Sequence, residues 1–190
     1  MKKVLIGLLI ALAAASFFLD QPVLRFAESI QHEHAVYFMS WFSHIGTLIV
    51  VLLFMTSFFM FEEKKTKWIK VVWLSFLAAF IITAILKPLF GRLRPAEYAI
   101  GAGFMFYSFP SAHTAIAFSL IPVLDREFPK LKWFWLAFAV FIGASRIYLG
   151  AHYLSDVVFG AVLGYLIGKF FVRLEEKKKL EWMSWRKIHH

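Results

Sequence analysis

The chain has 190 residues, of which 61% are hydrophobic and 19% aromatic, and it carries a formal net charge of +9. A water-soluble domain cannot bury this much apolar surface. The composition therefore excludes a soluble fold and predicts an all-α integral membrane protein with a single domain over residues 1–190. The sequence has no cysteine, which excludes a disulfide framework and thiolate chemistry.

Six apolar stretches, taken in chain order, predict six transmembrane helices packed in one bundle. Each approaches the length that spans ~30 Å of hydrocarbon at ~1.5 Å per residue. The stretches cover residues 4–19, 36–61, 71–89, 111–124, 133–149 and 154–171. They are long, continuous and not alternating, which favours helix over strand. A helix also satisfies its own backbone hydrogen bonds in lipid.

Three of these regions need further interpretation. The first stretch follows Lys2-Lys3 and has the pattern of a signal peptide, but we interpret it as a retained spanning helix. Residues 20–34 carry apolar side chains at helical spacing and predict either a short helix in the outer interface or an irregular loop. These apolar side chains are Val23, Phe26, Ala27 and Ile30. The fourth stretch is short, so we expect it to continue through Asp125 to Phe128 or to begin below the outer surface.

The distribution of basic residues predicts the orientation of the bundle. Sixteen of the 21 lysines and arginines fall on one side of the predicted arrangement. The other side holds Arg25, Lys87, Arg92, Arg94 and Arg146. By the positive-inside rule, both termini and the tail at 173–190 are expected in the cytoplasm. Topology therefore explains the basic surplus, and no nucleic-acid partner is predicted.

Three short motifs lie at helix ends that this topology places together on the outer face. They are Lys87-x6-Arg94-Pro95, Pro110-Ser111-Ala112-His113 and Ser145-Arg146-x5-His152-x3-Asp156. Lys87, Arg94 and Arg146 supply three cations, and the planar donor fork of arginine suits phosphate oxygens. Neighbouring cations repel one another unless an anion lies between them, which predicts a phosphate site. The alternative for any one cation is that it snorkels to lipid headgroups.

The second and third motifs add groups that can carry out chemistry. Ser111 precedes an apolar run and is expected to be a helix N-cap, where free amides and the helix dipole favour phosphate. His152 and Asp156 are four residues apart at the start of the sixth stretch, so they should share a helical face. A carboxylate bonded to one imidazole nitrogen fixes the tautomer and leaves the other nitrogen for attack. Either feature alone would more often be structural.

In this order, the three motifs resemble the signature of the type 2 phosphatidic acid phosphatase family. The resemblance implies that His152 is a nucleophile that forms a phosphohistidine, that Asp156 orients it, and that His113 is the general acid. The phosphate-binding residues that it implies are Lys87, Arg94, Ser111 and Arg146. It also implies that neither a metal nor another cofactor is needed. The family usually has glycine where this chain has Ala112, which would be strained if the position required a positive φ.

The expected function is hydrolysis of a lipid phosphate or diphosphate at the outer, periplasmic face of a bacterial-type inner membrane. Undecaprenyl pyrophosphate or the lipid A 1-phosphate group is favoured, and phosphatidylglycerophosphate or phosphatidic acid is the alternative. Vanadium haloperoxidases share the motifs but are soluble. The non-enzyme alternative is a lipid-phosphate binding or transport protein with an inactive site. Arg92 is interpreted as a surface or snorkelling residue or as a contact to a second phosphate, and His44 as a packing residue in the second stretch.

Overall fold

The computed structural model describes residues 11, 13–42, 44, 49, 52–53, 56–57, 59–60, 66–95 and 106–188. In these ranges the regular elements are helices, accompanied by an isolated β-bridge between Leu93 and Tyr107. The helices are α2 (Asp20–Ser29), α3 (Glu33–Phe42), α5 (Lys67–Phe90), α6 (Ala112–Glu127), α7 (Lys132–Tyr148) and α8 (Leu154–Ile188), with a short 3₁₀ helix η3 (Pro129–Leu131) between α6 and α7. The predicted all-α class is confirmed.

Within the described part of the chain, three helical segments are long and apolar enough to cross a membrane, namely Lys67–Phe90, Pro129–Tyr148 and Leu154–Lys177. They correspond to the third, fifth and sixth predicted stretches, and they make the chain an integral membrane protein. The first predicted stretch lies largely outside the described residues, as does much of the second beyond α3. The count of six helices and the side on which the termini lie therefore stay predictions.

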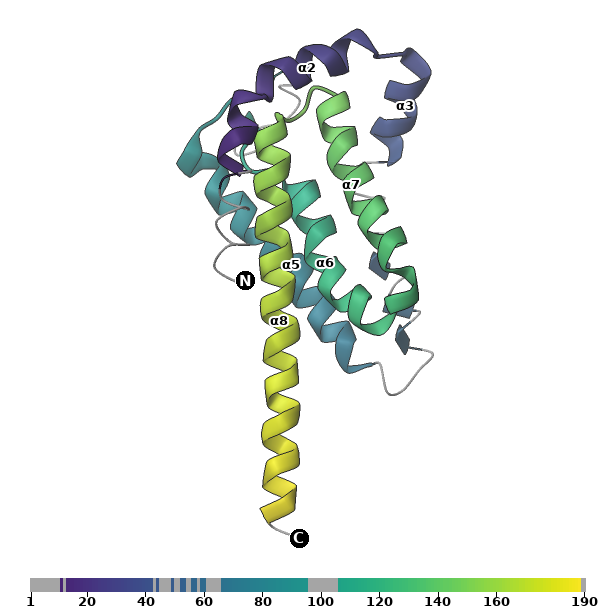
Figure 1. Ribbon diagram of the computed structural model, residues 1–190, viewed down its shortest axis with the longest axis vertical. Helices are drawn as coiled ribbons and strands as arrows, with labels where there is room; N and C mark the ends of the chain where they lie inside the picture. The colour runs from purple at the N-terminus through teal and green to yellow at the C-terminus, as the bar shows by residue number, and fades with distance from the viewer. Residues whose placement is uncertain are drawn as a thin grey trace.

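Helix α6 is short because protein surrounds it. It packs against α5, α7 and α8, and Figure 1 shows it lying among these longer helices. Its buried residues are Thr114, Ala115, Ile116, Ala117, Ser119, Ile121, Val123 and Leu124. The helix ends at Glu127, so the expected continuation past residue 124 is correct. Since α5, α7 and α8 pack around it, α6 need not match the thickness of the bilayer.

The most extensive helix contact joins α6 to α8 through a stripe of glycines. Gly160, Gly164 and Gly168 recur every four residues along α8. A Cβ added at Gly160 would lie 2.7 Å from the carbonyl oxygen of Ser111, and one at Gly164 would overlap the carbonyl oxygen of Ala115. Small residues at this spacing allow two helix backbones to approach closely. The stripe therefore holds the first turn of α6 directly against α8.

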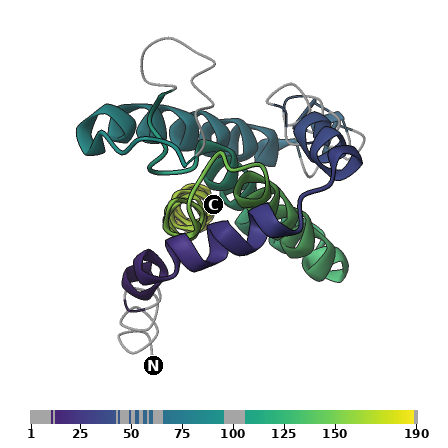
Figure 2. The same cartoon turned by 90° about the horizontal axis from the view of Figure 1, so that it is seen from above.

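Helix α2 lies across the connected ends of α7 and α8, as Figures 1 and 2 both show. The segment at 20–34 is thus helical over Asp20–Ser29, whereas its predicted place in the membrane interface stays a prediction. Of its apolar side chains, Leu24 and Ala27 are buried against the protein, while Phe26 and Ile30 are exposed. The helix is rotated so that the buried carboxylate of Asp20 points into the protein, where it has polar partners.

Two further expectations are corrected by the structure. Helix α8 does not end near residue 171 but continues to Ile188 and extends beyond the other helices (Figure 1). The tail from residue 173 is therefore mostly helical, and its place at the cytoplasmic interface stays a prediction. His44, expected to pack inside the second stretch, is exposed two residues after the end of α3.

Candidate active site

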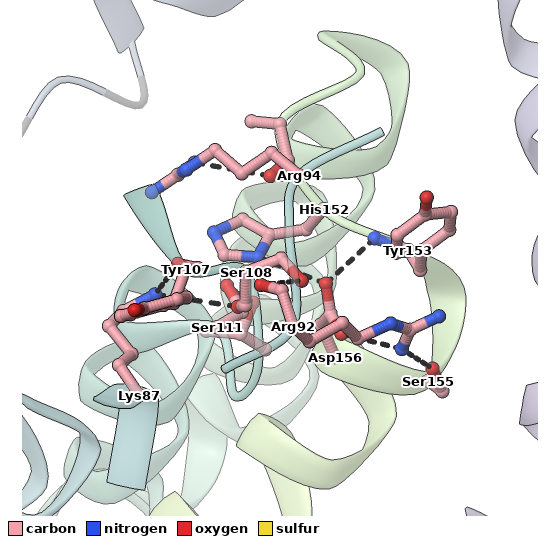
Figure 3. Close-up of polar contacts among 12 residues, drawn as sticks. Lys87, Arg92, Arg94, Tyr107, Ser108, Ser111, His152, Tyr153, Ser155 and Asp156 are labelled. Atoms are coloured by element: carbon pink, nitrogen blue, oxygen red, sulfur yellow. Dashed lines mark hydrogen bonds and ion pairs between the residues drawn. The ribbon is translucent and has the colours of Figure 1, made fainter. Parts of the chain in front are cut away.

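The three motifs meet where the end of α5, the first turn of α6 and the start of α8 lie together (Figure 3). Lys87 lies in the last turn of α5, as its position in the third stretch predicted. Gly91 ends that helix in the left-handed conformation, with φ 60°. Glycine adopts this conformation without steric penalty. The turn directs Arg92 and Arg94 back over the site.

The connection between α7 and α8 carries the third motif. Gly150 turns the chain with φ 63° after α7 ends. The amides of Ala151 and His152 then donate to the carbonyl oxygen of Arg146 at 3.0 and 3.2 Å. Because Arg146 and His152 are joined through these bonds, the short loop fixes the position of one relative to the other.

His152 and Asp156 form a buried pair. Nδ1 of His152 lies 3.3 Å from Oδ2 of Asp156, and the two side chains are 1% and 0% exposed. The same carboxylate oxygen accepts a hydrogen bond from the amide of Tyr153 at 2.9 Å. The predicted shared helical face is corrected, because α8 begins at Leu154 and His152 lies in the preceding loop. The pair forms because Asp156 reaches back from the first turn of α8 toward that loop.

The cations of the first motif approach His152 from the α5 side. Lys87 is buried, and its Nζ donates to the carbonyl oxygen of Tyr107 at 2.5 Å. Arg94 donates from NH1 to the carbonyl oxygen of Ala151, the residue next to His152, at 3.1 Å. Both side chains are therefore anchored by backbone carbonyls at positions beside the imidazole.

The electrostatic environment of His152 favours the neutral form of its imidazole. Burial is the largest cause that lowers its pKa well below the ordinary value, followed by the positive charges of Arg146, Lys87 and Arg94. A hydrogen bond with the backbone of Ser108 acts in the opposite direction. Burial also lowers the pKa of Arg94. A neutral imidazole has the free lone pair that a nucleophile or a general base requires.

Ser111 occupies the N-cap position of α6, as predicted, with φ −71° and ψ 111°. Its hydroxyl accepts a hydrogen bond from Oγ1 of Thr114 at 3.0 Å and makes no capping bond to a helix amide. Its own amide donates to the carbonyl oxygen of Asp156 at 3.1 Å. This bond ties the start of α6 to α8, the helix that carries Asp156.

His113 follows in the first turn of α6. It lies within electrostatic reach of His152 and of the three cations, so the structure gathers all the predicted site residues in one region. Ala112 has a negative φ, as does every non-glycine residue that the structure describes. Alanine is therefore unstrained where the family usually has glycine.

Arg92 lies on the opposite side of Asp156 from His152 (Figure 3). Its NH1 donates to Oδ1 of Asp156 at 2.8 Å and to Oγ of Ser155 at 2.6 Å, and its NH2 donates to Oδ2 of Asp20 at 2.6 Å. These partners correct the expectation of a surface or snorkelling residue. Asp20, Ser155 and Asp156 thus hold the guanidinium on the side of the Asp156 carboxylate that faces away from His152.

Asp20 is a neighbour of the site that the sequence analysis missed. It is 4% exposed and lies 72 residues before its partner Arg92. The only signal in the sequence is an acidic residue after an apolar stretch on the predicted outer side. That signal is too common to single out one aspartate.

Several curated proteins, among them phosphatases, are similar to this chain in sequence. A lipid A 4'-phosphatase of Bacteroides thetaiotaomicron is 31% identical over 186 residues, covering 84% of this chain and 78% of that protein. A bacitracin transport permease protein of Bacillus licheniformis is 44% identical over 63 residues, covering 33% of this chain and 31% of that protein. The chain thus spans about a third of the first curated relative it matches and 64% of the second. Other relatives are named phosphatidylglycerophosphatase B and undecaprenyl-diphosphatase.

The fold and the family model point the same way. The crystal structure of a PAP2-type phosphatidylglycerolphosphate phosphatase of Bacillus subtilis matches with a TM-score of 0.72 at 23% identity, covering 92% of this chain and 95% of that one. At this identity the match establishes the shared fold. The model of the PAP2 superfamily matches residues 68–180, a range that contains all three motifs. The chain therefore belongs to the PAP2 superfamily, as its motifs predicted.

Proposed function

We propose that the chain is a membrane lipid phosphatase that hydrolyses a lipid phosphate or diphosphate through a phosphohistidine on His152. The observation that carries this proposal is a buried imidazole that lies 3.3 Å from the carboxylate of Asp156 and within electrostatic reach of three cations. Such a site has an excess of positive charge, which a bound phosphoryl group would neutralise. Charges fixed in advance around the reacting group are the largest source of catalysis in many enzymes.

The proposed reaction has two steps. In the first, the ring nitrogen of His152 that does not face Asp156 forms a bond to phosphorus as the bond from phosphorus to the lipid oxygen breaks. His113 donates a proton to that leaving oxygen as a general acid. In the second, water attacks the phosphohistidine, His113 accepts its proton, and inorganic phosphate leaves. Asp156 stabilises the positive charge that the ring carries while it is phosphorylated.

The remaining site residues are assigned to the phosphoryl oxygens. Lys87, Arg94 and Arg146 would bind the oxygens on which charge accumulates in the transition state. Ser111 and the amides at the start of α6 would add donors at a helix N-terminus. Since three fixed cations supply the charge neutralisation that metal ions supply in many other phosphoryl-transfer enzymes, we propose that the reaction needs no metal.

A lipid substrate is supported by the apolar surface next to the cations. Leu89 and Leu93 lie between Lys87 and Arg94 in the sequence, and they are 73% and 70% exposed. Exposed apolar side chains beside the buried Lys87 and the half-buried Arg94 suit a molecule with a hydrocarbon chain and a phosphate headgroup. The names of the relatives support undecaprenyl diphosphate or lipid A as substrate, with phosphatidylglycerophosphate or phosphatidic acid as the alternative. The positive-inside bias supports a periplasmic site in a bacterial-type inner membrane.

The proposed function is tested with purified protein in detergent and a panel of undecaprenyl pyrophosphate, lipid A, phosphatidylglycerophosphate and phosphatidic acid. We expect phosphate release from at least one lipid at a rate that EDTA changes by less than about twofold, because fixed cations replace metal ions. Loss of release in EDTA that added Mg²⁺ restores would contradict the metal-free mechanism. Lipid binding without release from any member of the panel would favour the binding or transport alternative.

The lowered pKa of His152 predicts that kcat/KM stays high in mildly acidic solution. This ratio reports the free enzyme, in which the attacking imidazole must be neutral. Because burial and cations hold the pKa of His152 well below 6.5, the acidic limb of kcat/KM should lie below pH 6.5. The measurement is phosphate release as a function of pH, with the ionisation of the substrate followed separately by phosphorus NMR. An enzyme limb at or above pH 6.5 would contradict the assigned neutral state.

A further inference from the structure

The carboxylate of Asp20 on α2 is buried and makes three hydrogen bonds. Oδ1 accepts from the amide of Ser155 at 2.8 Å, and Oδ2 accepts from the hydroxyl of Ser155 at 2.7 Å and from NH2 of Arg92 at 2.6 Å. Ser155 is the second residue of α8, where amides have no partner within the helix. Asp20 therefore fixes the start of α8 and one side of the Arg92 guanidinium at the same time.

Arg92 then connects Asp20 to the carboxylate of the site. Its NH1 donates a hydrogen bond to Oδ1 of Asp156 at 2.8 Å, while Oδ2 of the same carboxylate faces Nδ1 of His152. One oxygen is thus reserved for the guanidinium, which sets the rotation of the carboxylate and presents the other oxygen to the imidazole. The guanidinium itself is held over the ring of Tyr153, 4.0 Å from its centroid. The planar fork of arginine suits a bridge between two carboxylates better than the single ammonium group of lysine does.

We propose that Asp20 and Arg92 are positioning residues that orient Asp156, so that α2 helps to set the geometry of the nucleophile. Neither touches the reacting phosphate. The inference rests on the proposed phosphatase function, because positioning is measured through turnover. It adds that a helix outside the three motifs is required for full activity.

Other contacts hold α2 in place when the charge of Asp20 is removed. Leu24 and Ala27 are buried against the protein. At the far end of the helix, the hydroxyl of Tyr148 accepts from the amide of His32 at 2.9 Å and donates to the carbonyl oxygen of Ile30 at 3.1 Å. Asp20→Asn is nearly isosteric, so we expect this variant to fold with α2 in its normal place.

The test measures kcat and KM for wild type, Asp20→Asn, Arg92→Gln and Arg92→Lys in the same detergent. We expect kcat to fall about 10- to 100-fold in each variant with KM within about twofold, because a small displacement of a catalytic group reduces turnover without removing substrate contacts. Combining Asp20→Asn with Arg92→Gln should lower kcat less than the product of the single effects, since both act through Asp156. Glu28→Gln is the matched control, an exposed acid on the same helix, and should retain wild-type kcat.

The pH profile separates charge from geometry. Arg92→Gln removes a positive charge beside Asp156, so the carboxylate stabilises a protonated His152 more strongly and the acidic limb of kcat/KM moves to higher pH. Arg92→Lys keeps the charge, so its kcat falls while the limb stays in place. A variant that merely folds poorly would lose active enzyme without moving the limb.

Two further results decide the proposal. Wild-type kcat in Asp20→Asn, or additive effects in the double variant, would overturn it provided that the wild type is active and His152→Ala is not. An inactive wild type on every lipid, or an active His152→Ala, would instead overturn the proposed function itself.

Discussion

Replacing His152 by alanine should abolish phosphate release, with a loss of at least about 10⁴-fold in kcat. The proposed mechanism passes through a covalent bond from this ring to phosphorus, and no other described side chain occupies its position against Asp156. The three cations would remain, so the variant should still bind the lipid phosphate. We therefore expect a large effect on kcat with little effect on affinity, which separates an enzyme from a binding protein.

The measurement pairs turnover with trapping of the intermediate. Wild-type protein quenched during turnover of a substrate with labelled phosphate should carry label that is released by acid, as expected for phosphohistidine, and His152→Ala should carry none. His32→Ala is the matched control, because this exposed histidine lies between α2 and α3 and bonds to its neighbours through its backbone, which alanine keeps: its amide donates to the hydroxyl of Tyr148, and its carbonyl oxygen accepts from the amide of Val36. Unchanged release in His152→Ala, with label retained, would assign the nucleophile to another residue.

The sequence predicts the site well because its motifs lie at helix ends. Lys87 in the last turn of α5, Ser111 at the N-cap of α6 and Asp156 in the first turn of α8 all lie where their stretches placed them. Once alternate helix ends are assigned to one face of a membrane, residues far apart in the chain must meet there. The order of the helices across the membrane is therefore enough to predict which motifs share a face, without knowledge of the tertiary contacts.

The sequence does not predict the network behind the site, since that depends on how α2 packs. Arg92 reads as one more basic residue on the outer side, and its ion pair with Asp20 joins positions 72 residues apart. Whether a carboxylate at the start of α2 is buried depends on the rotation of that helix against the protein, which the spacing of Phe26 and Ile30 does not specify. Patterns of apolar spacing identify a helix but do not reveal a buried polar partner that turns it.

The α6–α8 seam was predictable in part. The spacing of Gly160, Gly164 and Gly168 is visible in the sequence and is typical of close helix packing in membranes. The partner helix is not visible, because several apolar helices could accept such a stripe. The structure assigns it to α6, and this choice brings Ser111 within hydrogen-bonding distance of the backbone of Asp156.

Changing Gly164 to alanine should strongly destabilise the protein. The new methyl group would overlap the backbone carbonyl of Ala115, which cannot rotate away as a side chain would. Overpacking of this kind costs about 3 kcal/mol or more when backbones must separate. Alanine recovers only about 1 kcal/mol through its higher helix propensity. The cost of overpacking therefore exceeds the gain in helix propensity, and the thermal midpoint of the purified protein should fall by about 5 °C or more.

The matched control is Gly143→Ala in α7, where the added Cβ would lie 2.9 Å from Cγ1 of Val157. That neighbour is a side-chain atom, which can move more easily than a carbonyl, so we expect a smaller fall in the thermal midpoint. Gly164→Ala should also lose more activity than its stability predicts, because separating α6 from α8 stretches the bond between Ser111 and Asp156. If Gly164→Ala were as stable as the wild type, the glycine stripe would not set the helix separation. The geometry of the nucleophile would then depend on the loop and α2 alone.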